Sequence, residues 1–485
     1  MKQGLPLYGL SRLGLVILLA GQLLPMIDFS IVNVALESIT RSLSASPAEL
    51  ELIVAVYGVA FAVALAMGGR LGDNLGRRRI FMAGVAVFGV ASLLCGIAQS
   101  VWLLLFARTM QGIGAALAVP QILATIHVCL SGRRHARTLG LYSAIGGLAF
   151  IIGQVLGGTL LKLDIGGYGW RSAFLVNLPF CLLILICAPF WVPNTRSDKR
   201  KAIDFPGTVL LALALSCLLF PLALGPLWHW PLSCIAALAA SFGLFPLLWW
   251  VERRQERRQQ EPLLPPALFR LPSVRFGCAI ALLFFSSWSG FMFIVAYVLQ
   301  SGAGFSPLES GNSFIGLGTA YFIASLLSSR VTERKGNIPT LIIGSAIQMS
   351  GLLLLMATLA WVWPAPTLWT LLPATCLVGF GQAFIVSSFY RIFLSDVPLS
   401  HAGSGGALLS TVLQTAMGMG PIVLGSVLVH LLHRFQGRHD IALIASLGVE
   451  WSVMLLLVVG ACWMHRRNRR SETNQSEGKA LAVGE

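Results

Sequence analysis

A series of long apolar runs, separated by short polar segments, constrains this chain most. A helix of about 20 mostly apolar residues crosses the hydrocarbon core of a bilayer, so each run predicts a membrane span. Only 11% of the residues are charged, against about 25% in soluble proteins. The sequence therefore predicts an all-α integral membrane protein with fourteen transmembrane helices. The runs lie near 13–36, 50–69, 79–99, 101–127, 138–161, 170–192, 205–224, 230–251, 274–299, 311–329, 338–361, 367–393, 402–431 and 441–463.

The basic residues predict the orientation in the membrane. Of the 34 Lys and Arg residues, 28 fall in the tails and loops on the side of the N-terminus. Because cytoplasmic loops carry the excess of Lys and Arg, both termini are expected in the cytoplasm, with the chain in the cytoplasmic (inner) membrane. Orientation in the membrane also accounts for the net charge of +15. We therefore expect the protein to lie in a lipid bilayer and to bind no nucleic acid.

The chain also repeats itself. A shift of 260 residues lays 330–336 over 70–76, matching basic, aliphatic, acidic and glycine positions. Farther on, Gly379-Phe380-Gly381 echoes Gly112-Ile113-Gly114. Such repeats predict two parallel halves. The expected units are a six-helix half at 1–200, two inserted spans with a cytoplasmic linker at 201–267, a second six-helix half at 268–465, and a cytoplasmic tail at 466–485.

Two ionisable residues lie deep inside predicted spans, Asp28 in the first and Arg108 in the fourth. Each costs about 2.5–3.5 kcal/mol at a helix centre. Counted at about 1.5 Å per residue, their depths differ by only a few ångströms, so they can pair. The pair either braces the helices or takes part in function. Asp28 is predicted to be the only acid deep in a span, whereas Glu37, Glu309 and Glu450 lie at span ends and are interpreted as structural.

The segment from Gly69 to Arg79 must be a short aqueous loop, because its Asp and Arg cluster cannot lie in lipid. An ordinary basic loop is the simpler interpretation. However, the order of residues resembles G-x-L-a-D-x-x-G-R-[KR], the loop between spans two and three of the major facilitator superfamily. That resemblance implies the major facilitator fold. It also predicts a loop that gates motion between the halves through Gly69, Asp73, Gly76, Arg77 and Arg78.

Three more segments resemble the fourteen-span drug:proton antiporters of this superfamily. Leu24 to Leu36 is similar to L-D-x-T-I-V-N-V-A-L-P, Arg108 to Ala116 to R-x-x-Q-G-x-G-A-A, and Gly169 to Pro179 to W-R-x-x-F-x-x-N-x-P. Gln111 lies at i+3 from Arg108 and so shares its helix face. The run Gly403 to Gly420, with Gln414, also fits the family.

Span five departs from the family pattern G-x-x-x-G-P-x-x-G-G. Gln154 takes the proline position, and Ala149 takes the place of the first glycine. Gly153, Gly157 and Gly158 are kept, so close helix packing is expected there. Loss of the proline kink leaves the direction of transport open.

The resemblance implies a secondary active transporter, which exchanges protons for lipophilic, often cationic compounds and needs no cofactor besides the proton gradient. Asp28 and Arg108 would couple the proton, and the candidate cavity residues are Asn33, Gln111, Trp288 and Gln414. An alternative is proton-coupled export of an endogenous metabolite, peptide or siderophore. A multi-span membrane enzyme would need a cluster of catalytic polar residues, and a sensor would need a soluble domain; neither pattern is visible, nor is a metal motif. The sequence leaves a periplasmic adaptor open.

Overall fold

The computed structural model describes residues 9–130, 132–196, 204–225, 228–258, 260, 262–398 and 402–483. All regular secondary structure in these residues is helical, which confirms the predicted all-α class. The first part of the chain forms α1 (Arg12–Leu43), α2 (Pro47–Leu75), α3 (Arg77–Gly96), α4 (Val101–Cys129), α5 (Gly132–Leu163), α6 (Ser172–Leu175) and α7 (Asn177–Trp191), with short 3₁₀ turns η1 (Ile165–Gly167) and η2 (Gly169–Arg171) before α6.

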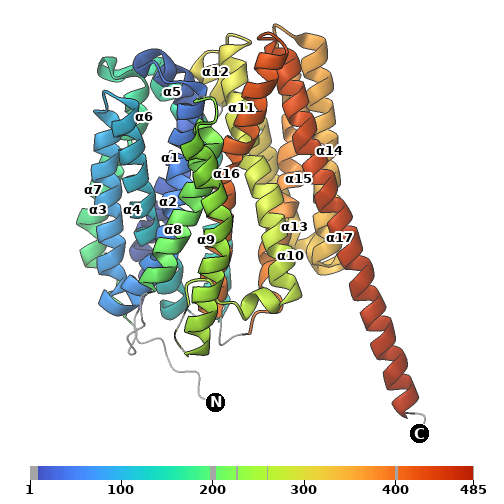
Figure 1. The fold of residues 1–485 in the computed structure, drawn as a ribbon. Helices are drawn as coiled ribbons and strands as arrows, with labels where there is room; N and C mark the ends of the chain where they lie inside the picture. The colour runs from blue at the N-terminus through green and yellow to red at the C-terminus, as the bar shows by residue number, and fades with distance from the viewer. Residues whose placement is uncertain are drawn as a thin grey trace.

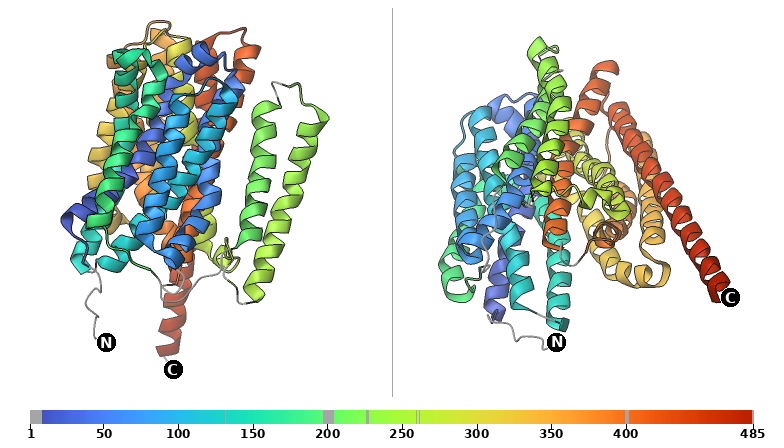
Figure 2. Two further views of the ribbon diagram at one scale, coloured as in Figure 1. Left: turned by 90° about the vertical axis from the view of Figure 1, so that its left-hand side faces the viewer. Right: turned by 60° about the horizontal axis from the view of Figure 1, so that its bottom comes forward.

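A separate helical hairpin follows, formed by α8 (Phe205–Leu224) and α9 (Leu232–Arg257). Figure 2 shows these two helices standing beside the main bundle. The remaining elements are η3 (Leu268–Arg270), α10 (Pro272–Ile280), the π-helical turn η4 (Ala281–Phe285), α11 (Ser286–Ser301), α12 (Pro307–Asn312), α13 (Ile315–Lys335), α14 (Asn337–Val362), α15 (Leu368–Leu394), α16 (Ala402–Arg434) and α17 (His439–Val483).

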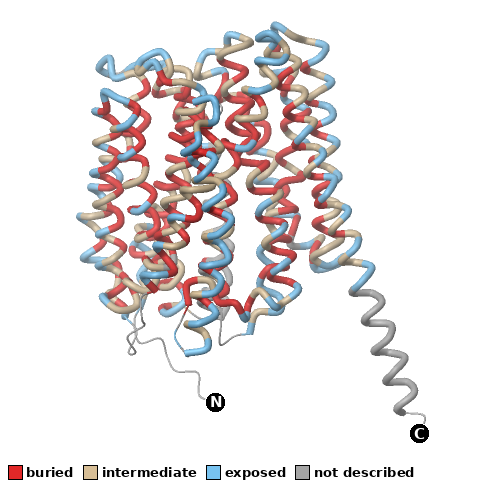
Figure 3. Tube along the Cα trace, in the orientation of Figure 1, coloured by how far each residue is buried: buried red, intermediate tan, exposed pale blue. Residues whose placement is uncertain are grey.

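The long helices run roughly parallel to one axis, so the bundle has two ends (Figure 1). We call them the α1–α2 end, which holds the turn between α1 and α2, and the α2–α3 end, which holds the turn between α2 and α3. The α12 segment and the turn between α16 and α17 also lie at the α1–α2 end (Figure 1). Buried residues gather in the bundle interior (Figure 3), whereas large apolar side chains such as Trp361 and Trp369 are exposed, as expected for contact with lipid.

Local sequence explains where several helices begin and end. Ser46 caps α2 with a reciprocal capping box to Glu49, which satisfies two backbone donors at the helix start. At the other end of α2, Gly76 takes a φ of 104°, a value that suits glycine because it has no Cβ. Gly336 ends α13 in the same way, with a φ of 89°. The loops that match in sequence therefore also match in backbone shape.

Twelve helices in the described part of the chain are long and apolar enough to cross a membrane. The predicted spans at 138–161 and 311–329 fall in α5 and α13, which are not among these twelve. In α13 the physical reason is composition, because polar and charged residues fill the last two turns of Ile315–Lys335. Length and apolar composition of the described residues therefore support twelve membrane spans and not the predicted fourteen.

The internal repeat extends to helix packing. A Cβ added to Gly114 of α4 would lie 2.7 Å from the Phe88 nitrogen of α3 and 2.9 Å from the Gly84 oxygen. A Cβ on Gly381 of α15 would meet the corresponding backbone atoms of Gln348 and Gly344 in α14, each at 2.5 Å. Glycine thus allows α3 to cross α4, and α14 to cross α15, at the same close approach.

We call α1–α7 the first half and α10–α17 the second half; these two sets of helices meet through small residues. A Cβ on Gly58 of α2 would lie 2.9 Å from the Gly418 Cα of α16, and one on Gly158 of α5 would lie 2.7 Å from the Leu308 Cα of α12. The helix α8 packs against both α2 and α16. The α8–α9 hairpin therefore covers one of the seams along which the two sets of helices meet.

Candidate functional site

The two charges that the sequence places at a similar depth do meet. Asp28 of α1 and Arg108 of α4 form an ion pair between Oδ2 and Nη1, and the side chains of both are 0% exposed. The contact brings together residues 80 positions apart in sequence. A buried pair of this kind is stable only where further hydrogen bonds satisfy its remaining polar atoms.

Asp28 receives two such bonds on its other oxygen. Oδ1 accepts from Gln111 Nε2 at 3.0 Å and from Asn177 Nδ2 at 2.9 Å. Both amides also donate to Ser92 Oγ, at 2.9 Å and 3.3 Å. Sequence reasoning selected Gln111 but missed Ser92 and Asn177. The signal for Asn177 was present, since it is the asparagine of the W-R-x-x-F-x-x-N-x-P segment.

Arg108 makes hydrogen bonds through two of its three guanidinium nitrogens, whereas Nη2 is buried without a hydrogen-bond partner among the described residues. Nε donates to the Ile53 carbonyl of α2 at 3.1 Å, and Nη1 also donates to Gln111 Oε1 at 2.8 Å. Its Cζ lies 4.4 Å from the ring centroid of Tyr57 and 5.8 Å from that of Phe174. An aromatic face attracts a guanidinium most strongly away from water, so these rings fix the cation in the first half.

This geometry stabilises Asp28 as a carboxylate. Three donors surround it, one of them a cation, and hydrogen bonds to the charged form favour that form. The ion pair therefore joins α1 to α4 inside the bundle.

The other predicted cavity residues lie in different surroundings. Asn33 of α1 is 1% exposed, and its amide atoms make no hydrogen bond within the described residues. Gln414 of α16 is 7% exposed, and its backbone carbonyl oxygen lies 3.4 Å from a Cβ built on Gly58 of α2. Both residues are therefore nearly buried, on helices from opposite halves.

Trp288 of α11 lies in an aromatic cluster of the second half. Its ring stacks on Tyr321 of α13 at a centroid distance of 6.1 Å and lies 5.9 Å from the rings of Phe284 and Phe285. Phe285 in turn meets Phe389 of α15 at 5.0 Å. Aromatic side chains from three segments thus form one cluster, in which the phenylalanines and Trp288 are buried and Tyr321 is partly exposed.

The predicted gating loop binds the end of α7. Arg77 Nη2 donates to Asp73 Oδ1 at 2.6 Å, and its Nη1 donates to Thr195 Oγ1 at 3.1 Å. Arg78 Nη1 donates to the Pro189 carbonyl at 2.8 Å. Gly69 lies on the same helix as Asp73, opposite Pro120 of α4, and Gly76 forms the turn. These contacts tie α2 and α3 to α7, all within the first half.

Span five links the two halves. A Cβ on Gly157 would lie 2.8 Å from Ile31 Cγ1 of α1, and Gly153 faces Ser30 of the same helix. Gly158 faces α12 on the other side. Gln154 is 0% exposed, and its Nε2 approaches Met292 Sδ of α11 at 3.9 Å. The residue that replaces the family's proline thus reaches across to the second half.

The prediction that Asp28 is the only deeply buried acid in a span is wrong. Glu51 of α2 is 2% exposed and Glu450 of α17 is 0% exposed. Glu450 Oε1 accepts a hydrogen bond from Gln348 Nε2 of α14 at 3.4 Å. Position along a span gives depth but not the helix face that a residue occupies, so residues near predicted span ends can still be enclosed by neighbouring helices.

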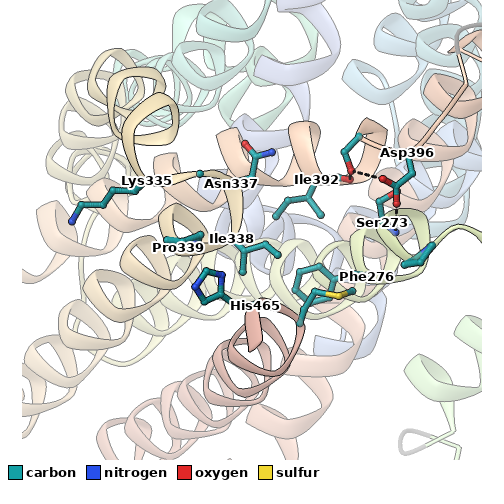
Figure 4. Close-up of a pocket in the computed structure, with 13 residues that line it drawn as sticks. Ser273, Phe276, Lys335, Asn337, Ile338, Pro339, Ile392, Asp396 and His465 are labelled. Carbon is teal, nitrogen blue, oxygen red and sulfur yellow. Dashed lines mark hydrogen bonds between the residues drawn. The ribbon is translucent and has the colours of Figure 1, made fainter. Parts of the chain in front are cut away.

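A cavity of about 450 Å³ lies at the α2–α3 end of the second half, beside the repeated loop at 330–336. Figure 4 shows Lys335, Asn337, Asp396 and His465 around it. Asp396 Oδ2 accepts a hydrogen bond from the Ser273 backbone nitrogen at 3.3 Å. This cavity adjoins a loop and is separate in sequence from the residues around Asp28.

Comparison with known proteins places this site in a family. A sequence model of the Major Facilitator Superfamily matches residues 18–421. The probable actinorhodin transporter of Streptomyces coelicolor is 31% identical over 429 residues, covering 88% of this chain and 74% of the relative. The puromycin resistance protein of Streptomyces alboniger is 32% identical, with 85% and 81% covered. The methylenomycin A resistance protein of Bacillus subtilis is 29% identical, with 92% and 93% covered.

Solved structures share the fold. The human organic anion transporter MFSD10 (TETRAN) superimposes with a TM-score of 0.61 at 18% identity, covering 92% of this chain and 99% of that structure. A POT family transporter in complex with 5-aminolevulinic acid gives a TM-score of 0.65 at 13% identity, with 92% and 96% covered. At these identities the likeness concerns the path of the backbone alone.

Proposed function

This chain belongs to the Major Facilitator Superfamily, and we propose that it exports lipophilic, often cationic compounds across the cytoplasmic membrane in exchange for protons. The observation that carries the proposal is the fully buried Asp28–Arg108 ion pair. A charge pair is expensive in a membrane interior and marks ion or proton pathways there. The resistance and export names of several relatives support the class of compound.

For the topology, we propose that α5 and α13 also cross the membrane and complete fourteen spans. Both are helices of more than 20 residues that pack against long neighbours of the bundle. The excess of Lys and Arg on the side of the N-terminus supports an orientation with the α2–α3 end and both termini in the cytoplasm. The α1–α2 end then faces the opposite side.

The ion pair suggests how protons could drive export through two states, one in which the pair is closed and one in which Asp28 carries a proton and Arg108 has a new partner. In the state described here Arg108 neutralises Asp28. A proton arriving from the α1–α2 end would compete with Arg108 for the carboxylate, and the released charge would favour a second arrangement of the helices. Release of the proton at the other end would restore the pair. No group besides the protein and the proton is needed for this cycle.

The two halves would divide the work. The first half would hold the proton site, whereas the aromatic cluster around Trp288 and Tyr321 in the second half would contact the compound. Asn33 and Gln414, buried on α1 and α16, supply polar groups from each half. Such a mixture of apolar rings with a few polar groups is typical of small-molecule sites.

A relative named as a probable actinorhodin transporter favours a second candidate, the export of a metabolite that the cell itself makes. The same proton mechanism would serve either substrate. The two candidates differ in which compounds stimulate proton release, so a panel that includes drugs, dyes and culture extracts distinguishes them.

The test is transport in vesicles with an imposed pH gradient. Wild-type protein should move lipophilic cations against their gradient, and Asp28→Asn should insert and fold but lose the pH-driven flux. Glu37→Gln is the matched control, because Glu37 sits on the same helix in a surface ion pair with Arg41. Undiminished pH-driven flux in Asp28→Asn would refute the proposal.

A further inference from the structure

Glu51 lies where the two halves meet. It sits near the start of α2, at the α1–α2 end, and is 2% exposed. Across the seam, a Cβ on Gly425 of α16 would lie 2.7 Å from Glu51 Oε1. The next residue, Ser426, places its Oγ 3.2 Å from Glu51 Oε2. The carboxyl group therefore connects a helix of the first half to a helix of the second.

No ion pair within the described residues includes Glu51; those near this end join Glu37 to Arg41 and Asp440 to Arg438. On α16, the cation Arg434 lies about two turns beyond Ser426, at the end of the helix, and is exposed. On α4, Arg108 is already paired with Asp28.

Other titratable groups near Glu51 are few. On α1, Glu37 and Arg41 at this end are paired with each other, and on α11 Tyr297 lies within electrostatic range of Glu37 and Glu51. On α16, His430 is exposed one turn beyond Ser426. The helix α8 carries Cys217 as its titratable residue, and the basic residues of α3 lie at the α2–α3 end.

The two contacts of Ser426 Oγ are consistent with a protonated Glu51, because the hydroxyl hydrogen can point to either neighbour. Ser426 Oγ also lies 3.5 Å from the Leu222 carbonyl oxygen of α8. Leu222 is in the last turn of α8, where carbonyl groups have no amide partner within the helix and need another donor. A hydroxyl group has one proton to donate. If Ser426 gives it to Leu222, the contact with Glu51 is a hydrogen bond only when Glu51 itself carries a proton.

We propose that Glu51 is a second proton-binding site, whose carboxylic acid joins α2 to α16 and whose deprotonation opens the α1–α2 end. The chemistry is a single step, in which the proton passes from the carboxyl oxygen to water that enters as the seam separates, and the resulting carboxylate is hydrated by that water. A neutral acid can stay enclosed between helices, whereas a carboxylate without a cation cannot. This inference rests on the proposed proton-coupled function and deepens it: Asp28 holds the driving proton, and Glu51 determines when this end opens.

The test measures the distance between the halves as the pH changes. Spin labels on Ser42→Cys and Arg434→Cys report on exposed positions at the ends of α1 and α16. The nine native cysteines are replaced by alanine in this background. Double electron–electron resonance in lipid nanodiscs, from about pH 5 to about pH 9, should show the short-distance population of the parent falling as the pH rises.

Variants identify the group that titrates. Glu51→Gln keeps a donor for Ser426 without a charge, so it should hold the short distance across the whole pH range. Ser426→Ala should move the transition to lower pH by removing the partner of the acid. Glu37→Gln, an acid of the same end, should behave like the parent. An unchanged transition in Glu51→Gln would overturn the proposal, as would a distance that follows sodium ion concentration and ignores pH.

The readout needs no transported compound, so the two proposals can fail separately. If pH-driven flux survives Asp28→Asn while the distance still depends on Glu51, the proposed function fails and the second proton site remains. If flux requires Asp28 but the Glu51→Gln distance follows pH as in the parent, only the second site fails. Glu51→Gln is also expected to slow turnover by about tenfold or more, because one conformation is favoured at every pH.

Discussion

The Cζ atom of Arg108 lies 4.4 Å from the ring centroid of Tyr57. Tyr57 itself donates a hydrogen bond to the Pro25 carbonyl of α1 at 3.1 Å. The ring therefore stands between the helix that carries Asp28 and the guanidinium that pairs with it. Any movement of Arg108 away from Asp28 must also slide past this ring, which couples the ion pair to the packing of α2.

Arg108→Ala should destabilise the protein by about 3–5 kcal/mol, because it leaves the Asp28 carboxylate buried without its cation. The double variant Asp28→Asn/Arg108→Ala should recover most of that loss but not proton coupling. Tyr57→Phe is the control: it keeps the ring and removes one hydrogen bond, a loss of about 0.5–1.5 kcal/mol. Thermal unfolding in detergent and flux in vesicles measure both effects. Normal coupling in Arg108→Ala would argue that the pair is only structural.

Trp288→Ala should change which compounds are carried while leaving proton coupling intact. The substitution removes a ring that stacks on Tyr321 at a centroid distance of 6.1 Å, and so reshapes an aromatic cluster away from the ion pair. Competition by a panel of dyes, together with the number of protons released per compound, measures the two effects. An uncoupled Trp288→Ala with an unaltered compound range would contradict the division of work between the halves.

Asp73→Asn should slow transport with little change in affinity for the compound. Asp73 accepts a hydrogen bond from Arg77 at 2.6 Å, and Arg77 also reaches Thr195 beyond α7. Weakening this charge-assisted contact loosens the α2–α3 turn without touching the aromatic cluster. Initial rates at several compound concentrations separate the two parameters. A large loss of affinity at an unchanged maximal rate would show that the loop binds the compound directly.

Gly158→Ala should weaken the contact between α5 and α12. The added methyl group would lie 2.7 Å from the Leu308 Cα and 2.8 Å from the Pro307 oxygen, distances that force the two backbones apart. Gly243→Ala in α9 is the matched control, since nothing lies within 4 Å of its Cβ; there alanine should stabilise the helix by about 0.5–1 kcal/mol. Equal thermal stability of the two variants would rule out a tight seam at Gly158.

Much of the fold followed from the sequence because long apolar runs and basic loops report directly on depth in a membrane. The Asp28–Arg108 pair was predictable for the same reason, since depth alone brought the two charges to one level. Glu51 was missed and Glu450 was misjudged, because burial depends on the helix face and on the neighbour opposite it. Ser92 was missed because one serine in an apolar run carries no pattern, and its role comes only from Gln111 and Asn177 converging on it.

The α8–α9 hairpin leans on α2 and α16, one helix from each half, and stands outside the main bundle (Figure 2). The hairpin therefore makes the two lipid-facing flanks of the transporter unequal. On this side the hairpin lies between the bilayer and the contact of α2 with α16. At the opposite flank, where α5 packs against α12 and α13, no additional helix covers the contact among the described helices. A compound that enters from the bilayer would then reach the protein mainly from this second flank, along the contact between Gly158 of α5 and Leu308 of α12.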